Sequence, residues 1–378
     1  MRTNEIPNLH GFRFFAAILV IIYHVESFKL QYFHLPSYSA APFIYHLGSY
    51  AVRFFFVLSG FLITWLLIIE KESAEKIGKN INLRKFYLNR IFRIWPLYYV
   101  LVIVVFYVLP NIPLFWVPTY DRNFIVPHNI KRFALYVIFC PNLAMLLHGN
   151  VIYLGQLWSL SVEEFFYLFF PVGLYFLKRK NFLAYFIALT ILFFLLPGIK
   201  ILFGGNSSNT DQNMLFWYFQ TYNLTPFTLG AIAGYYYFLL KKTPQVKAYI
   251  KQIRLVGYMA LLISVFVIVA GINFSYLTTS VYSLLFALLI FCLSISDTHI
   301  KLLNNPVIIY LGKISYGIYM LHPLAIVICI KLFYFDTGSN LLTSVFLDVI
   351  VIVTTLFISA ISYRFLEKPF LKLKKMVG

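Results

Sequence analysis

Two side chains that could do chemistry stand inside one apolar stretch at about residues 11–28, namely Arg13 and His24. Charged or titratable groups are costly in lipid, so a spanning segment that carries them is a candidate functional site. Arginine keeps its charge and needs an anionic partner, whereas a neutral imidazole can act as a base or a nucleophile. On a helix the two residues would share one face about 16 Å apart, within reach of two ends of a long substrate. The alternative for His24 is a structural hydrogen bond between helices.

A second pair of arginines, Arg90 and Arg93, opens the apolar stretch that begins near residue 94. Residues three apart lie on one face of a helix. Two guanidinium groups there suit the phosphates of a nucleotide-bearing donor, because each can bind a phosphate through two parallel hydrogen bonds. The alternative is a positive anchor at the membrane edge whose side chains reach the lipid headgroups.

Two adjacent carboxylates, Glu163 and Glu164, stand near the start of another apolar stretch. Neighbouring helical residues point about 100° apart, so one of the two would face the helix bundle. That carboxylate could orient His24 or pair with an arginine, and the alternative is a structural ion pair. A further histidine, His322, precedes Pro323, where we expect a polar contact at a helix kink rather than catalysis.

The composition places these residues in a membrane protein. Hydrophobic residues make up 61% of the chain and charged residues only 12%, with a mean hydropathy of +0.80. An ordinary soluble protein has about a quarter of its residues charged, so that class is excluded. Apolar stretches of roughly twenty residues, long enough to cross about 30 Å of hydrocarbon, recur along the chain. They begin near residues 11, 50, 94, 158, 182, 223, 254, 276, 314 and 341.

These stretches predict an all-α polytopic membrane protein with about ten transmembrane helices, forming a single integral membrane domain over residues 1–378. Lysine and arginine cluster in every second loop, and the alternate loops hold few, beginning with Lys29. By the positive-inside rule both termini would be cytoplasmic, which requires an even number of crossings. The net charge of +18 is therefore explained by topology and predicts no nucleic-acid partner.

Several common kinds of site have no support in the sequence. There is no phosphate-binding G-x-x-x-x-G-K-[ST] motif, no G-x-S-x-G motif of serine hydrolases and no H-E-x-x-H motif of zinc proteases. The three cysteines lie far apart in apolar sequence without C-x-x-C spacing. We therefore predict neither a metal site nor a disulfide framework.

Six ordered blocks resemble the acyltransferase family 3 proteins, which are integral membrane O-acyltransferases of cell-surface glycans. Together the blocks run over nearly the whole chain. They are Leu9-x-Gly11-x-Arg13 with His24, FFVLSGFLI at residues 55–63, Arg90-x-x-Arg93, WSLSVE at residues 158–163 with Phe166-Tyr167, LGKISYG-x-Y-x-LHP at residues 311–323, and Glu367-Lys368-Pro369.

The resemblance implies a ten-helix enzyme that moves an acyl group, usually acetyl, from cytoplasmic acyl-CoA to a sugar hydroxyl on the far side of the membrane. His24 would be the catalytic base or a transient acyl carrier, and Glu163 would support the histidine or the acceptor. Arg13, Arg90 and Arg93 would hold the CoA phosphates or line the path of the donor. Acetyl-CoA is then the expected co-substrate, with no metal.

The sequence departs from the family pattern at two positions. Many members carry aspartate before the glycine of the first block and before the Phe-Phe block, where this sequence has His10 and Arg53. Any role that those acids have in other members cannot be transferred to this chain.

Some members of the family add an extracellular SGNH-type esterase-like domain. Because this sequence ends shortly after its last predicted span, we expect the stand-alone type, with transfer either direct or through a separate periplasmic or extracellular partner.

We therefore expect an O-acyltransferase of a surface polysaccharide or lipopolysaccharide in the cytoplasmic (inner) membrane of a bacterium. Its partners would be the lipid bilayer, acyl-CoA and a glycan or glycolipid acceptor. Two alternatives stay open: a glycolipid transporter or flippase, for which internal repeats and broken helices are typical, and a membrane acyltransferase that acts on a lipid or a protein. The sequence identifies neither the acceptor sugar, the acyl group nor the oligomeric state, and it does not separate base from acyl carrier at His24.

Overall fold

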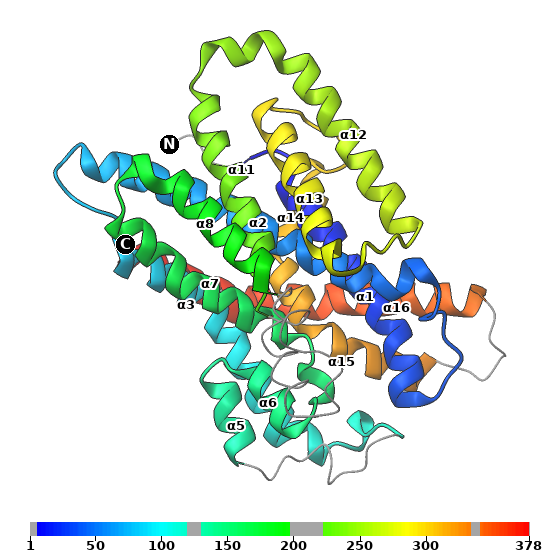
Figure 1. Ribbon diagram of the computed structural model, residues 1–378. Coiled ribbons are helices and arrows are strands. Elements are labelled where there is room, and N and C mark those ends of the chain that lie inside the picture. Colours follow the sequence, from blue (N-terminus) through cyan, green and yellow to red (C-terminus); the bar gives the residue numbers. More distant parts are fainter. Residues whose placement is uncertain (1–5, 119–129, 197–221, 334–340, 378) are drawn as a thin grey trace. The chain divides into compact units, whose positions relative to one another are not determined.

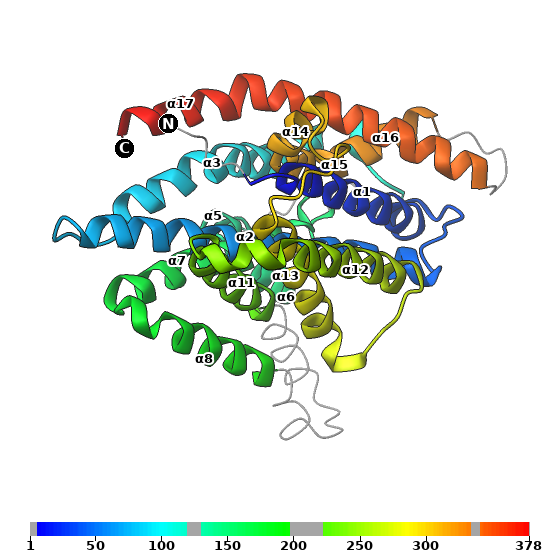
Figure 2. The same ribbon diagram turned by 90° about the horizontal axis from the view of Figure 1, so that it is seen from above.

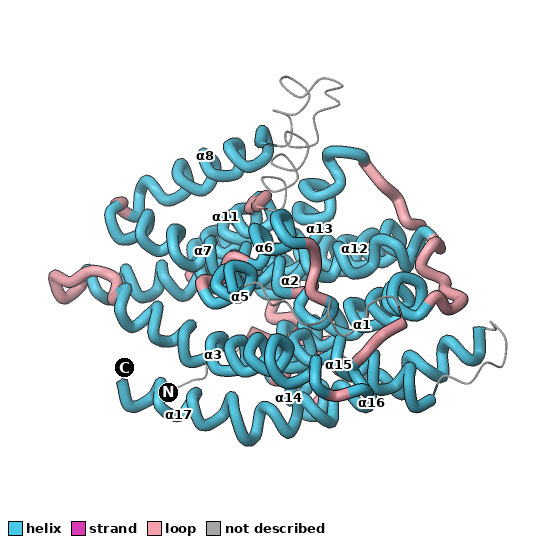
Figure 3. Tube along the Cα trace, turned by 90° about the horizontal axis from the view of Figure 1, so that it is seen from below, coloured by secondary structure: helices cyan, strands magenta, loops and turns pink. Residues whose placement is uncertain are grey.

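The computed structural model describes residues 6–118, 130–196, 222–333 and 341–377, and most of them are helical (Figure 3). The prediction of an all-α protein is confirmed. The helices form because long apolar stretches satisfy their backbone hydrogen bonds internally, as lipid requires. Prolines occupy helix starts, where a missing N–H costs nothing, for example Pro42 in α2 and Pro141 in α6.

Eight helices among the described residues are long and apolar enough to cross a membrane. They cover eight of the predicted spans and are Leu9–Phe33, Pro42–Glu75, Leu83–Asn111, Leu157–Phe176, Pro244–Val269, Thr278–Ile295, Ser315–Phe333 and Leu341–Leu373.

The other two predicted spans, near residues 182 and 223, correspond to α8 (Phe182–Leu195) and α11 (Thr225–Lys241), with 14 and 17 described residues. Residues 197–221 lie outside the described part of the chain. The count of about ten spans and the cytoplasmic position of both termini therefore stay predictions.

The chain divides into two compact units. Unit 1 comprises Met1–Arg13, Ser49–Leu83 and Val162–Ile309. Within it α11, α12 and α13 lie side by side (Figure 1). Its helices are the first residues of α1 (Leu9–Phe33), most of α2 (Pro42–Glu75), most of α7 (Leu157–Phe176), η5 (Arg179–Asn181), α8, α11, η7 (Pro244–Tyr249), α12 (Ile250–Val269), η8 (Ser275–Leu277), α13 (Thr278–Ile295) and the start of α14 (Pro306–Lys313).

Unit 2 comprises Phe14–Gly48, Arg84–Ser161 and Tyr310–Gly378. In it α16 continues through a π-helical turn into α17 as one long helical path, and α15 packs against α16 (Figure 2). Its helices are the rest of α1, α3 (Leu83–Ile103), η1 (Val104–Val108), η2 (Leu109–Asn111), η3 (Pro113–Phe115), α5 (Ile130–Val137), α6 (Pro141–His148), η4 (Ile152–Leu154), the start of α7, the end of α14, α15 (Ser315–Phe333), α16 (Leu341–Ser362), η9 (Tyr363–Glu367) and α17 (Lys368–Val377).

Glycines bring α2 and α11 of unit 1 into backbone contact. A Cβ atom added at Gly60 would overlap the carbonyl oxygen of Phe227, and one added at Gly230 would overlap that of Val57. Both helices therefore present a residue without a side chain at the crossing, which is the usual way in which membrane helices pack closely. The crossing fixes the part of α2 that carries Ser59, next to Gly60.

A buried ion pair lies near the end of α1 in unit 2. The Nζ atom of Lys29 donates to Oε1 of Glu26 and to Oγ of Ser344, both at 2.8 Å. The other carboxylate oxygen of Glu26 accepts from the hydroxyl of Ser37 at 3.0 Å and from the backbone N–H of Tyr38 at 2.5 Å. Both charged residues are only 1% exposed. Our assignment of Lys29 to a loop is wrong, because α1 runs on to Phe33 and the paired carboxylate allows the ammonium to be buried.

Replacing Lys29 with methionine should lower the free energy of unfolding by about 3 kcal/mol, because the buried carboxylate of Glu26 loses its cation. The double variant Lys29→Met/Glu26→Gln should recover much of this loss, since no unpaired charge remains. Thermal unfolding in detergent, followed by tryptophan fluorescence, measures both, with the exposed Lys251→Met as a matched control. A single variant as stable as the wild type would contradict a stabilising role for this pair.

Candidate active site

His24 contacts a second histidine. It lies in α1, partly exposed, and its Nδ1 atom is 3.0 Å from the carbonyl oxygen of Val20 and 3.2 Å from Nε2 of His322. His322 lies in α15, is fully buried, and its ring centroid is 4.8 Å from that of His24. These residues belong to unit 2. The expected polar contact of His322 is confirmed, and its partner is the candidate catalytic histidine.

His322 is the acceptor in its contact with His24. A carbonyl oxygen only accepts hydrogen bonds, so the Nδ1 atom of His24, which lies 3.0 Å from the carbonyl of Val20, carries a proton. Nε2 of His322, 3.2 Å from the same nitrogen, then presents its lone pair to His24. Nδ1 of His322 is buried, and within the described residues it has no hydrogen-bond partner.

The same pattern determines which nitrogen of His24 can react. With His322 as acceptor, the proton of neutral His24 lies on Nδ1, between the carbonyl of Val20 and Nε2 of His322. Nε2 of His24 then carries the lone pair, because both hydrogen-bond contacts of His24 among the described residues are made by Nδ1. Such an imidazole can take a proton or attack a carbonyl carbon through Nε2, while the group at Nδ1 holds the ring in place.

Hydrogen bonds from a distant block support the turn of α15 that carries His322. The hydroxyl of Tyr319 is 2.6 Å from Oγ of Ser159 and 3.1 Å from the carbonyl oxygen of Gln156. The side-chain amide of Gln156, which is 2% exposed, donates to the carbonyl of Met320 at 3.0 Å. The block around residue 159 thereby positions a histidine that lies more than 160 residues later in the chain.

Glu163 is held within unit 1. Its Oε1 atom accepts a hydrogen bond of 2.6 Å from the hydroxyl of Ser59 in α2 and a short one from the hydroxyl of Tyr167, one turn later in α7. The residues belong to the FFVLSGFLI and WSLSVE blocks, so these two blocks meet at this carboxylate. Its predicted role as a support for His24 or the acceptor stays a prediction.

Arg13 and His24 lie in one continuous helix, α1, as predicted, with Arg13 in unit 1 and His24 in unit 2.

Arg90 lies in α3, where its guanidinium group covers the ring of Phe86 at 5.5 Å from the ring centroid. This stacking orients the planar guanidinium group.

Arg93, one turn after Arg90, is electrostatically coupled to a buried carboxylate of unit 2. Glu367 is 5% exposed and lies in the π-helical turn η9, and the charges of Arg93 and Glu367 attract each other. A Cβ atom at Gly317 would approach Oε1 of Glu367 to 3.0 Å, so the glycine of the LGKISYG block leaves room for this carboxylate. The Glu367-Lys368-Pro369 block and the Arg90-x-x-Arg93 block thus interact electrostatically through Glu367 and Arg93.

Arg53, the second departure from the family pattern, lies in unit 1 and is accommodated by hydroxyl groups. Its guanidinium donates to Oγ of Ser49 at 3.0 Å and to Oγ1 of Thr279 at 3.2 Å.

In the part of the chain that the structure describes, no three histidine, cysteine, aspartate or glutamate side chains gather as metal ligands would.

The fold and the histidine pair define a helical membrane protein with two contacting histidines within its candidate spans. The sequence matches a family model described as "Acyltransferase domain" over residues 6–364. The chain therefore belongs to the acyltransferase 3 family. Acyl transfer is the class of chemistry that this family implies.

Relatives with assigned names point the same way. The chain is 30% identical over 390 residues to O-acetyltransferase OatA of Staphylococcus aureus (strain NCTC 8325 / PS 47), with 97% of this chain and 57% of the relative covered. A protein of Staphylococcus aureus (strain COL) with a provisional O-acetyltransferase name is 29% identical over 385 residues, with the same coverage. The chain thus spans a little over half the length of these relatives. No solved structure matches the chain at a significant level.

His322→Phe should remove one of the two acceptors at Nδ1 of His24 and leave only the carbonyl of Val20, whereas His322→Gln should keep a second acceptor through its side-chain oxygen. ¹⁵N NMR of histidine-labelled protein in lipid should therefore give His24 with hydrogen on Nδ1 in the wild type and in His322→Gln, and a larger share of hydrogen on Nε2 in His322→Phe. The His24 signals are assigned by their loss in His24→Asn. Hydrogen on Nε2 of His24 in the wild type would contradict this assignment.

Proposed function

We propose that this protein is a membrane O-acyltransferase that moves an acyl group, acetyl in the first instance, from cytoplasmic acyl-CoA to a sugar hydroxyl of a surface polysaccharide or lipopolysaccharide. Membership in the acyltransferase 3 family and the similarity to OatA support the reaction class. The observation that carries the proposal is the contact between His24 and His322, in which the contacts of His24 with the described residues use Nδ1 and leave Nε2 for a substrate.

In the direct route, Nε2 of His24 takes the proton of the acceptor hydroxyl as the sugar oxygen attacks the thioester carbonyl. The carbon–sulfur bond breaks, coenzyme A leaves as a thiolate, and the thiolate takes the proton from His24 to become a thiol. The carbonyl of Val20 and Nε2 of His322 accept from Nδ1 and stabilise the imidazolium that exists between the two proton transfers. General base catalysis of this kind contributes about 10²- to 10⁴-fold.

In the covalent route, Nε2 of His24 attacks the thioester carbonyl itself and the thiolate leaves. The acyl-imidazole then gives its acyl group to the sugar hydroxyl, whose proton returns to the thiolate or to solvent. Both routes use the same nitrogen of His24 and the same acceptors at Nδ1. They differ in whether donor and acceptor must be bound together.

The remaining predicted residues have supporting roles in this proposal. Arg90 and Arg93 bind phosphates of acetyl-CoA at the cytoplasmic start of α3, and Arg13 lines the path of the donor, about 16 Å before His24 along α1. Glu163 orients the acceptor or the histidine from its position beside Ser59 and Tyr167. The setting is the bacterial cytoplasmic membrane, and a separate periplasmic or extracellular protein completes delivery to the glycan where direct transfer does not reach it.

Cells with the wild-type protein should carry ester-linked acetate on their surface glycan, and cells with no copy or with His24→Ala should not. Acetate is measured by proton NMR of purified glycan before and after mild alkali, at matched protein levels in the membrane. His299→Ala, which changes an exposed histidine, serves as the control and should behave as wild type. Equal acetate in all strains would reject glycan acetylation and favour another acceptor or transport.

Arg90→Gln and Arg93→Gln should each raise the KM for acetyl-CoA about tenfold, because a charged hydrogen bond to a phosphate is lost. The control is Arg84→Gln, an exposed arginine of the same helix that removes the same charge. Acetyl-dephospho-CoA identifies the phosphate that is contacted, since the variant that has lost the 3′-phosphate contact no longer discriminates between the two donors. An unchanged KM in both variants would assign these arginines to the lipid headgroups instead.

A further inference from the structure

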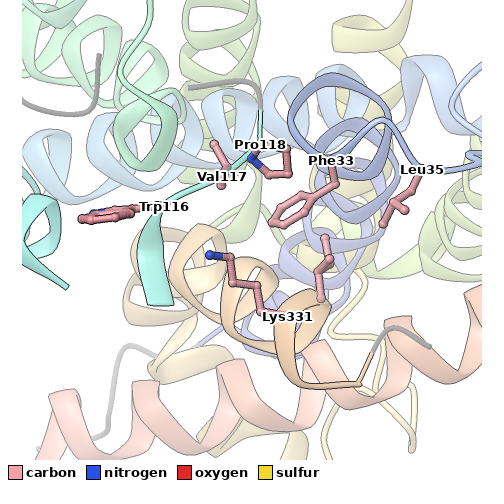
Figure 4. A pocket seen from close by; sticks show the side chains of 7 residues that line it. Phe33, Leu35, Trp116, Val117, Pro118 and Lys331 are labelled. Carbon is pink, nitrogen blue, oxygen red and sulfur yellow. The ribbon is translucent and has the colours of Figure 1, made fainter. Parts of the chain in front are cut away.

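A pocket of about 570 Å³ opens in unit 2 where α1 and α15 end. It is lined by Phe33, Leu35, Trp116, Val117, Pro118, Ile330 and Lys331, as Figure 4 shows. The lining includes one cationic side chain and no carboxylate. Its size is that of a site for a small molecule or for one part of a larger ligand.

The wall of the pocket is fixed by hydrogen bonds to the segment between η2 and Pro118. The indole N–H of Trp116 donates to the carbonyl of Pro110 at 2.9 Å, and the Nζ atom of Lys331 donates to the carbonyl of Pro113 at 3.1 Å. The hydroxyl of Tyr153 makes a short hydrogen bond to the carbonyl of Phe115. This segment is therefore held against α15, and Trp116 has a set position.

The lining suits a sugar that carries a negative charge. A pyranose ring has an apolar face of C–H groups that stacks on an indole or phenyl ring, and Trp116 and Phe33 provide such rings. Lys331 uses one of its three ammonium hydrogens on Pro113 and keeps two for an anionic group. In Figure 4 its amino group points toward the space between Trp116 and Phe33.

The pocket lies at a defined distance from the histidine pair. Phe33 follows His24 by nine residues in α1, and Lys331 follows His322 by nine residues in α15. The two helices therefore run in the same direction from the histidine contact to the pocket, over about 13 Å at 1.5 Å per residue. An oligosaccharide of a few sugars can bridge this distance.

We propose that this pocket is a binding subsite for an acidic saccharide, which holds the acceptor glycan by a uronic-acid-type carboxylate while a sugar farther along the chain reaches His24. The inference rests on the proposed function, because it identifies the class of acceptor. Lys331 binds the carboxylate, and Trp116 and Phe33 bind the sugar ring.

The test measures dissociation constants for tetragalacturonic acid and for neutral maltotetraose by titration calorimetry, with the full chain in nanodiscs of neutral lipid. The acidic saccharide should bind the wild type at least about tenfold more tightly than the neutral one, and added salt should weaken its binding. Lys331→Met and Trp116→Ala should each weaken it about tenfold. Lys331→Arg and Trp116→Phe should bind nearly as the wild type does.

The control variant Lys301→Met removes an exposed lysine outside the pocket and should bind as the wild type does. His24→Ala should also bind normally, so binding and acyl transfer are read separately. Wild-type affinity in Lys331→Met, or equal affinity for both saccharides, would reject the pocket as a site for acidic saccharides. This holds even if His24-dependent glycan acetylation is observed. Normal pocket binding with no His24-dependent acetate would reject the proposed function and leave only a saccharide-binding site.

A second comparison, in nanodiscs that contain phosphatidylglycerol, tests whether the pocket binds a lipid phosphate instead. Loss of Lys331-dependent saccharide binding there would assign the pocket to lipid.

Discussion

Lipid offers no hydrogen-bond partners, so every polar side chain within a span must find its partner inside the protein. This constraint organises both units. In unit 2 it pairs Glu26 with Lys29 and brings His322 against His24. In unit 1 it gathers the hydroxyls of Ser59 and Tyr167 around Glu163. At each of these sites a polar side chain lies where two helices meet.

Contacts of this kind also explain why the ordered blocks of the sequence contain polar residues and glycines at fixed positions. Gln156 and Ser159 hold the turn of α15 that carries His322, so a block in mid-chain supports a histidine near the end. Gly317 leaves space for Glu367, whose charge attracts Arg93. The blocks are thus parts of a few contact networks, each of which spans more than a hundred residues of sequence, rather than separate binding motifs.

The histidine pair differs from the usual arrangement in which a carboxylate orients a catalytic imidazole. A neutral acceptor at Nδ1 fixes the tautomer of His24 without placing a permanent negative charge within the membrane. The carbonyl of Val20 is a second acceptor at the same nitrogen and cannot donate, so both contacts favour the proton of His24 on Nδ1.

The sequence by itself determined the all-α membrane class, eight of the spans, and the placement of Arg13 and His24 on one helix, because hydropathy and helical periodicity are local properties. It drew attention to His322 through its position before proline but assigned it only a structural contact. The partner of His322, the burial of Lys29 and the pocket at Lys331 were decided by tertiary structure. Each depends on which faces of distant helices come together, and side-chain packing between segments some three hundred residues apart has no signature in local periodicity.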